Sequence, residues 1–593
     1  MIRINIILKK NQKKGANGSI SAGIGTRNKY NAALNFNYRN KKINAFVNYG
    51  FRYNPVYGNG SMTRENFFSD STWYLNQYSK SQKTVASNMV KAGMDFFIDD
   101  ANTLGISSAF SAKNDADKQS IEYQNFNINK ILTGVSLRGI DEDEASENID
   151  VAANFKHSFK KPKQNISIDF SFSTSKETTA EEINQQDYSS DYSPLPLNPI
   201  LQNTFNNQKF NVAVFQSDYS HPLGVKSKIE TGVKSIVRNI NNEFVFENFS
   251  FPSDKWQKDS LRYNHYIFDE QVHAAYATYS NTFGKINFQA GARLEQAITK
   301  SELLQTNTVG ESDYFSYFPG GHFAYQLNKQ NQLQLSYSKR INRPSVESLI
   351  AFMDYDDPLN VRLGNPKLKP EYIHSAELSW ALQNEKNTLT TSMYYRKIVD
   401  MIQRYRIVDS SGVATITYQN YSGATNTGFE FVARNEFFKW MNLTSNLNLF
   451  RSEINASNIQ SDLHNEGFSW SAKMTVNIIL PAGFQVQIAG DYKAPAPVAL
   501  GTMYALNGVD AGIKKELFKG KGNLNLNMSD VFNTRQFEID IVQPTYHHRF
   551  IRKRESQIFT INFTYKIGKS DPSQKQKARK EGENQQIRGE DLF

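Results

Sequence analysis

The chain has 593 residues, of which 39% are hydrophobic and 13% aromatic, and its formal net charge is +10. No apolar run approaches the roughly 18 residues that a transmembrane helix needs, which excludes a helical membrane protein. The 68 basic and 58 acidic residues are spread along the chain rather than gathered in one stripe, which argues against nucleic acid as a partner.

The N-terminal residues 1–16 combine a short apolar stretch with a basic turn. Isoleucines at positions 2, 4, 6 and 7 indicate a strand, but Arg3 and Asn5 interrupt them and Lys9 ends them. The stretch is too short and too broken for a secretory signal peptide. We expect a strand over residues 4–10, loosely held, and a hinge that leads into the next strand at residues 17–27.

Alternation of apolar and polar residues then recurs almost to the C-terminus. Such alternation is typical of half-buried strands, and strands of about 9–11 residues are long enough to cross a bilayer when tilted. In a transmembrane barrel only alternate residues face lipid, so the mean hydropathy of -0.58 is compatible with one. The clearest alternating segments cover residues 43–52, 165–172, 286–297, 331–340, 522–530 and 557–568.

Any one of these segments would also fit a soluble β-sandwich. The whole set favours a single barrel, because residues 17–568 contain no Pro/Ser-rich linker that would separate several sandwich domains. We count roughly 20 candidate strands, and about 22 would leave about 25 residues for each strand and its connection. The predicted fold is all-β: a single large antiparallel transmembrane β-barrel of roughly 22 strands over residues 17–568, with long extracellular loops.

Long polar stretches mark where those loops are expected. We predict loops over residues 54–81, 175–206, 239–263 and 341–372, and a solvated loop at Asp141–Glu144. In segment 286–297 the polar residues share one face, which we expect to point into the barrel lumen. The candidate lumen-facing residues are Asn287, Gln289, Arg293 and Glu295.

The stretch 340–372 reads RINRPSVESLIAFMDYDDPLNVRLGNPKLKPEY, and four prolines predict an ordered connection between two strands. Its NRPS and DDPLNVRLGNPKLKPEY segments resemble the signature of TonB-dependent receptors, specifically the Bacteroidota-type outer-membrane β-barrel family. Residues 273–297 and 4–40 are also similar to that family. We call residues 340–372 the signature loop. The residues that carry the resemblance there are Arg343, Pro344, Ser345, Pro358, Gly364, Asn365, Pro366, Leu368, Pro370 and Glu371.

This resemblance implies a barrel in the outer membrane of a Gram-negative bacterium, in contact with outer-membrane lipid. Complete members import a nutrient such as an iron chelate, a glycan or a peptide, and TonB opens an N-terminal plug inside the barrel. Residues 1–16 would correspond to the plug's last strand and hinge. We therefore expect that signal peptide and plug are missing, that TonB acts only on a plug-bearing form, and that this chain alone is inactive or an open pore.

Other functions have weaker support. The chain has no HExxH, GxSxG or Walker A motif, so we expect no enzyme. GIGTRN at 23–28 lacks the third glycine of a dinucleotide site, His547-His548 lacks the usual metal spacing, and DYDDPLN at 354–360 lacks the complete EF-hand pattern, so we expect no cofactor or metal. The charged tail 569–593 is expected to be disordered and periplasmic. The alternative function is a non-transporting surface β protein, an adhesin or a glycan-binding module.

Overall fold

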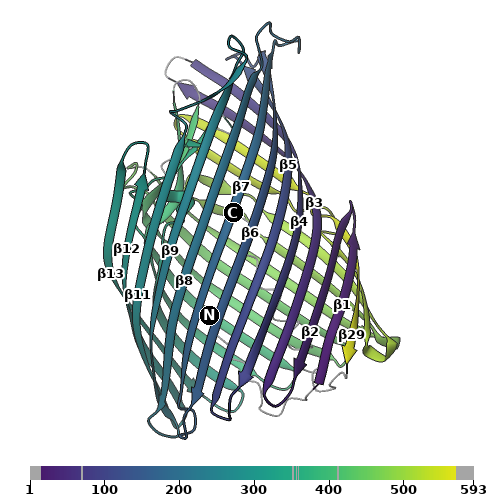
Figure 1. Cartoon of the computed structure of the whole chain (residues 1–593), viewed down its shortest axis with the longest axis vertical. Helices are drawn as coiled ribbons and strands as arrows, with labels where there is room; N and C mark the ends of the chain where they lie inside the picture. Colours follow the sequence, from purple (N-terminus) through teal and green to yellow (C-terminus); the bar gives the residue numbers. More distant parts are fainter. Residues whose placement is uncertain are drawn as a thin grey trace.

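The structure is a computed structural model that describes residues 15–68, 71–349, 353–354, 357, 359–409, 413–461 and 463–568. Long tilted strands surround one lumen (Figure 1). The barrel strands are β1 (Gly15–Gly25), β2 (Lys29–Arg39), β3 (Ile43–Phe68), β4 (Ser71–Phe97), β5 (Asn102–Phe126), β6 (Leu132–Ser158), β7 (Asn165–Tyr188), β8 (Ile200–Pro222), β9 (Ser227–Ser250), β11 (Asn264–Phe283), β12 (Ile286–Leu303), β13 (Thr308–Gln326), β14 (Asn331–Asn342), β17 (Glu371–Gln383), β18 (Asn387–Val408), β19 (Ala414–Phe438), β20 (Met441–Asn455), β21 (His464–Leu480), β22 (Phe484–Lys493), β25 (Leu506–Leu517), β26 (Gly522–Ser529) and β29 (Ile558–Gly568).

The sheet closes on itself, because the last strand, β29, pairs antiparallel with β1. Closure gives every barrel strand two neighbours, so its backbone hydrogen bonds are satisfied without water, as a bilayer requires. The predicted all-β fold is confirmed, with 22 antiparallel strands in the barrel. At the tip of the first hairpin, residues 26–28 connect the paired Gly25 and Lys29, and Arg27 and Asn28 both have positive φ, a left-handed conformation that tight turns use.

The remaining elements lie in the connections. They are β10 (Lys255–Lys258), β15 (Met353–Asp354), β16 (Asn360–Leu363), β23 (Ala496–Val498), β24 (Gly501–Met503), β27 (Phe537–Gln543), β28 (Tyr546–Arg554), the short helix α1 (Val346–Leu349), and the 3-10 turns η1 (Pro481–Gly483) and η2 (Phe518–Gly520). In the described part of the chain, none of the helices has the length and apolar character needed to cross a membrane.

The strands present an apolar outer face. On β3, Val47 and Tyr49 are exposed on that face, and on β12 Phe288, Leu294 and Ile298 are exposed in the same way. These side chains belong to an apolar band around the barrel, at the level of the hydrocarbon core of the membrane. The connections at one end are all short turns, whereas several at the other end are much longer, such as residues 343–370 and 530–557, so the second end is extracellular.

Three of the predicted long loops are wrong. Residues 54–81, 175–206 and 239–263 are mostly strand, because β3, β4 and β7–β9 continue far beyond the bilayer, and Asp141–Glu144 lies within β6. Outside the membrane the outer face of a hairpin meets water and carries polar residues too, so the regular alternation disappears while the cross-strand hydrogen bonds persist. The expectations for residues 1–14 and 569–593 concern positions outside the described residues.

A hairpin from the last extracellular connection completes the wall where the barrel strands are short. Strands β1 and β2 have 11 residues each, whereas β3 has 26. The extracellular half of β3 therefore pairs with β28, from Gly58 opposite Arg554 to Asn66 opposite Tyr546. Strand β27 pairs in turn with β24.

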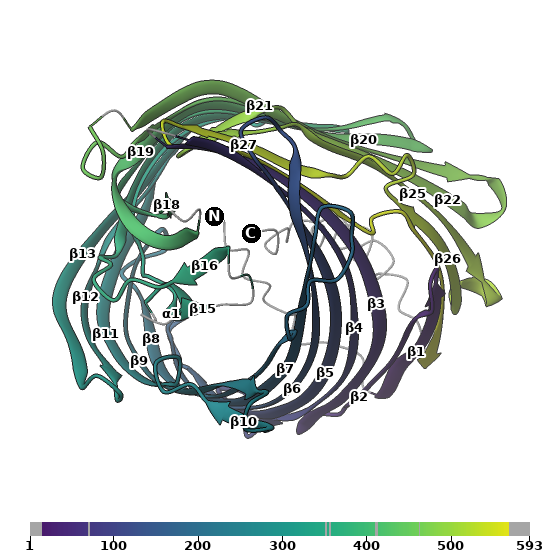
Figure 2. The same ribbon diagram turned by 90° about the horizontal axis from the view of Figure 1, so that it is seen from above.

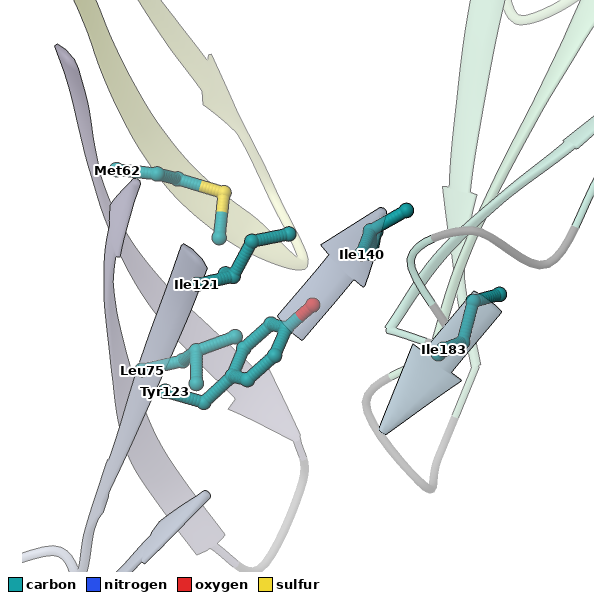
Figure 3. Packing of buried hydrophobic residues seen from close by; sticks show 6 residues of the cluster. All are labelled: Met62, Leu75, Ile121, Tyr123, Ile140 and Ile183. Carbon is teal, nitrogen blue, oxygen red and sulfur yellow. The ribbon is translucent and has the colours of Figure 1, made fainter. Parts of the chain in front are cut away.

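A hydrophobic cluster lies on the lumen side of this extracellular wall (Figure 3). Because lumen-facing residues of neighbouring strands meet there, β3 to β7 each contribute at least one member. The partly buried Leu359 of the signature loop and Phe550 of β28 pack against the cluster. The loop is thus attached to the wall by apolar contacts. The buried members are Met62, Leu75, Ile121, Tyr123, Ile140 and Ile183.

Candidate functional site

The described part of the signature loop enters the lumen instead of extending into solvent. Figure 2 shows α1, β15 and β16 inside the ring of strands. Strand β16 pairs antiparallel with β15 and parallel with the extracellular end of β19, where Asn360 is opposite Ala414. The loop therefore joins two parts of the wall, β19 through backbone pairing and β3–β7 through Leu359.

Asn360 strengthens this bridge through two arginines. Its Oδ1 accepts hydrogen bonds from Nη1 of Arg64 on β3 at 3.2 Å and from Nη1 of Arg406 on β18 at 2.9 Å. Arg64 also donates to the backbone oxygen of Leu359 at 3.3 Å. Gln77 on β4 donates to Asp357 at 3.2 Å. One loop segment is therefore bonded to strands far apart in the sequence.

The pKa values of two buried groups near Asn360, those of Arg64 and His548, are shifted. Both residues lie above the apolar band, on the extracellular side. Burial and the nearby guanidinium of Arg406 lower the pKa of Arg64 to about 10, so Arg64 stays charged at neutral pH. Burial, followed by the charges of Arg406 and Arg64, lowers the pKa of His548 to about 2, so its ring is neutral. At neutral pH Arg64 is therefore charged, whereas the imidazole of His548 is uncharged.

The structure brings together two sets of residues that the sequence analysis singled out separately. Nη2 of Arg343, in the signature loop, lies 2.6 Å from Oε2 of Glu295 on β12. Arg293 also pairs with Glu295, and Nε of Arg343 donates to the hydroxyl of Tyr314 at 3.0 Å. Two guanidinium groups thus share one carboxylate at the base of the loop.

Asn287 and Gln289 do not take part in this contact. Asn287 accepts a hydrogen bond from Thr282 at 2.8 Å, near the periplasmic turn. Gln289 is exposed and lies opposite His322 of β13. Of the four candidates on β12, Arg293 and Glu295 belong to the ion-pair group with Arg343. Asn287 and Gln289 lie on the periplasmic half of the wall, away from this group.

The other signature residues shape the loop. Asn365 donates from its backbone to Ser348 at 2.7 Å and from its side chain to the backbone of Tyr418 at 2.9 Å. Glu371 accepts from the Asn342 side chain at 2.7 Å and from the Ile402 backbone at 2.5 Å. These contacts hold the two loop ends against β14, β18 and β19.

Of the remaining signature positions, the hydroxyl of Ser345 accepts from the backbone of Ser348 at 3.2 Å, at the start of α1. Gly364 and Leu368 are buried, whereas Pro344, Pro366 and Pro370 are half-buried or exposed. Pro358 lies outside the described residues.

An acidic cluster that the sequence analysis missed lines the lumen above the apolar band. Lys113 lies 2.6 Å from Asp115 and 2.9 Å from Glu144, and Lys83 lies 3.2 Å from Asp115. Burial raises the pKa of Glu142 to about 7. Alternation within Asp141–Glu144 was the signal that could have placed two of these residues on the lumen face of a strand. The cluster comprises Asp115, Asp117, Glu142, Glu144, Glu177 and Glu181, with Lys83 and Lys113.

Residues 157–565 match the sequence model of the outer membrane protein beta-barrel family. The chain belongs to this family. No match was found among curated protein sequences. The outer membrane is therefore the location of this barrel, with the apolar band in contact with lipid.

Solved structures share the fold of this outer membrane barrel. The ferric yersiniabactin uptake receptor FyuA from Yersinia pestis is 11% identical with a TM-score of 0.56, over 94% of this chain and 81% of that one. The copper transporter OprC is 10% identical with a TM-score of 0.63, over 94% and 83%. The siderophore receptor PiuA from Acinetobacter baumannii is 12% identical with a TM-score of 0.60, over 93% and 82%. At these identities the likeness establishes the fold alone.

The motifs that were considered for cofactors and metals lie within strands of the wall or in the signature loop. His547 and His548 lie on opposite faces of β28, His547 beside Asp540 at 2.7 Å and His548 buried. Gly23 and Gly25 belong to β1, and a side chain at Gly23 would collide with Asn562 on β29. These glycines serve close strand packing. Within DYDDPLN, residues 355, 356 and 358 lie outside the described residues.

Proposed function

We propose that this chain is the barrel of a Bacteroidota-type TonB-dependent receptor, which takes up a nutrient across the outer membrane together with a plug. The observation that carries the proposal is the signature loop inside the lumen, anchored by Asn360 to Arg64 and Arg406. A surface adhesin needs no ordered loop within its barrel. A receptor does, because a loop held there can contact a solute between the cell exterior and the plug.

The anchored loop and the charged lumen walls support a binding role for the extracellular half of the barrel. A ligand that enters from outside meets the acidic cluster of β5–β7 on one side and arginines of β16 and β28 on another. Arg293, Glu295 and Arg343 fix the base of the loop. We propose that they position the loop, and that Asn287 and Gln289 line the exit path.

The rest of the proposed receptor follows from the resemblance. Residues 1–16 would be the last strand of a plug and its hinge, residues 17–568 the barrel, and residues 569–593 a periplasmic tail. TonB would act on a plug-bearing form; without a plug the barrel would be inactive or an open pore. Among iron chelates, glycans and peptides we favour a metal chelate, since similar structures include receptors for siderophores and a copper transporter. We propose no catalytic role.

Uptake by whole cells tests this function. A strain that lacks the gene would be compared with one that carries it, with the plug-bearing form included, using labelled ferric siderophores, labelled oligosaccharides and labelled peptides. We expect uptake of one class to require the gene and to stop when TonB is removed. Uptake that is unchanged for all three classes, combined with gene-dependent adhesion of cells to immobilised glycans, would overturn the proposal in favour of the adhesin.

A further inference from the structure

The basic residues on the two faces of strand β28 differ in their contacts. On the outer face, Arg549 is paired with Glu538 at 2.5 Å, and Nζ of Lys553 donates to the backbone oxygen of Asn533 at 2.6 Å. The lumen face is set by Phe550, which packs on the hydrophobic cluster. Since alternate residues of a strand share a face, Arg552 and Arg554 also face the lumen.

Arg552 and Arg554 have neither a hydrogen bond nor an ion pair with any described residue, and both side chains are exposed. Basic residues on the outer face of the same strand have partners, so the absence is specific to the lumen face. A guanidinium offers five donors in a planar fork that matches carboxylate and phosphate oxygens. Two guanidinium groups without such partners, two residues apart on one face of the strand, therefore have donors available to bind an anion.

Small residues lie beside these arginines. Across the strand pair, Arg554 is opposite Gly58 and Arg552 is opposite Gly60. The next strand places Ser81 opposite Gly58 and Ser79 opposite Gly60. The Ser79 hydroxyl lies beside Gly60, 2.7 Å from where a Cβ there would be. The arginines therefore border a low surface of small residues that carries hydroxyl groups.

A third arginine comes from the signature loop. Arg362 follows Asn360 by two residues on β16, and Asn360 is fixed to Arg64 on the neighbouring strand β3. Partial burial and the nearby charges of Arg554 and Arg362 lower the pKa of Arg552, against the opposing effect of Asp117. Like charges held this close repel one another, and an anion that binds between them relieves the repulsion.

We propose that Arg552 and Arg554, with the positive charge of Arg362 nearby and the low surface formed by Gly58, Gly60, Ser79 and Ser81, bind a ligand that carries two or more carboxylate or phosphate groups. This inference rests on the proposed function and names the chemistry of its ligand. Arg64 and Arg406 are not part of the site, because both are bonded to Asn360. We call the seven residues the arginine recess.

Calorimetry on the purified, detergent-solubilised chain tests the arginine recess, with citrate and pyrophosphate as probes and sucrose and spermine as neutral and cationic comparisons. We expect citrate or pyrophosphate to bind and sucrose not to bind. Arg552→Gln and Arg554→Gln should each weaken binding by about tenfold, as expected for the loss of one charge-assisted contact. Ser79→Leu, which fills the recess and keeps every charge, should weaken binding as well.

Lys553→Gln is the matched control, since it removes the same charge from the opposite face of the same strand, and it should change affinity less than twofold. Equal weakening by Lys553→Gln and Arg552→Gln would show only a general effect of net charge and would overturn the proposal. So would a wild-type chain that binds neither anion, or binds spermine alone. A folded barrel is verified by faster gel migration without heating.

Whole-cell uptake separates this inference from the proposed function. Anion binding that depends on the arginine recess, in cells that take up none of the three ligand classes, would refute the receptor function and leave the site. Uptake that persists in Arg552→Gln and Arg554→Gln at wild-type rates would refute the site and leave the receptor function.

Discussion

At the scale of single residues, the most consequential contact is the amide of Asn360 between Arg64 and Arg406. A buried guanidinium is costly without a partner, and one oxygen here serves two of them. The contact between Glu295 and Arg343 has the same character, since two arginines share one carboxylate. In both places a single acceptor attaches the signature loop to the wall.

Replacing Asn360 tests that attachment. Asn360→Ala leaves both arginines without this oxygen, and we expect a loss of about 2–3 kcal/mol in the free energy of unfolding, because hydrogen bonds to charged groups are the strong ones. Asn360→Asp keeps the oxygen and adds a charge, so it should be at least as stable as the wild type. Urea unfolding in detergent measures both, and an unaffected Asn360→Ala would show that the bridge contributes nothing.

A second prediction concerns the ion pair between Lys29 and Glu555, whose atoms are 2.7 Å apart and whose side chains are only 8% and 6% exposed. Breaking a buried pair leaves an unpaired charge, so Glu555→Gln should cost about 3–5 kcal/mol. The pair between Arg451 and Glu466 is 64% and 47% exposed and is the control. Glu466→Gln should cost less than about 1 kcal/mol. Similar losses in the two variants would contradict this ranking.

At the scale of elements, strand length is the main difference between expectation and structure. Alternation predicted the membrane parts of the strands, because lipid on one side and water on the other impose different residues on the two faces. It could not predict the extensions, where Asp141 and Glu142 point to opposite faces and both are polar. It also could not predict that Arg343 contacts Glu295, since this pairing depends on a loop folding back into the lumen.

The extension of β6 gives a pH-dependent prediction. The pKa of Glu142 is raised to about 7, so the folded chain binds a proton at this site that the unfolded chain releases above about pH 4.3. Stability is therefore lost as pH rises from about 4.3 through 7. Glu142→Gln should remove this loss and be about 1–2 kcal/mol more stable than the wild type at pH 8, with little difference at pH 4.

Asp141→Asn is the control for that experiment, since Asp141 lies on the outer face with its side chain 61% exposed. It should show no comparable gain at pH 8. Urea unfolding at the two pH values measures all three proteins. A Glu142→Gln variant whose stability follows the wild type across this range would contradict the assignment.

At the scale of the whole molecule, closure of the sheet decides whether the chain folds. Removing residues 558–568 deletes β29 and leaves β1 and β26 without a neighbour. Open edges are not tolerated in a bilayer, so we expect this variant to show no heat-modifiable folded band. A chain that ends at residue 568 keeps the closure and should fold like the full chain. Normal folding without β29 would contradict a closed barrel.

The length of the strands also determines the height at which the protein meets its surroundings. Strand β6 has 27 residues, and at about 3.3 Å per residue a strand of that length measures roughly 90 Å along its own axis. The hydrocarbon occupies only about 9–11 residues of a tilted strand. The extracellular rim of the barrel therefore lies far above the bilayer, among the sugars of the cell surface. A solute or an antibody contacts this rim well before it reaches the membrane surface.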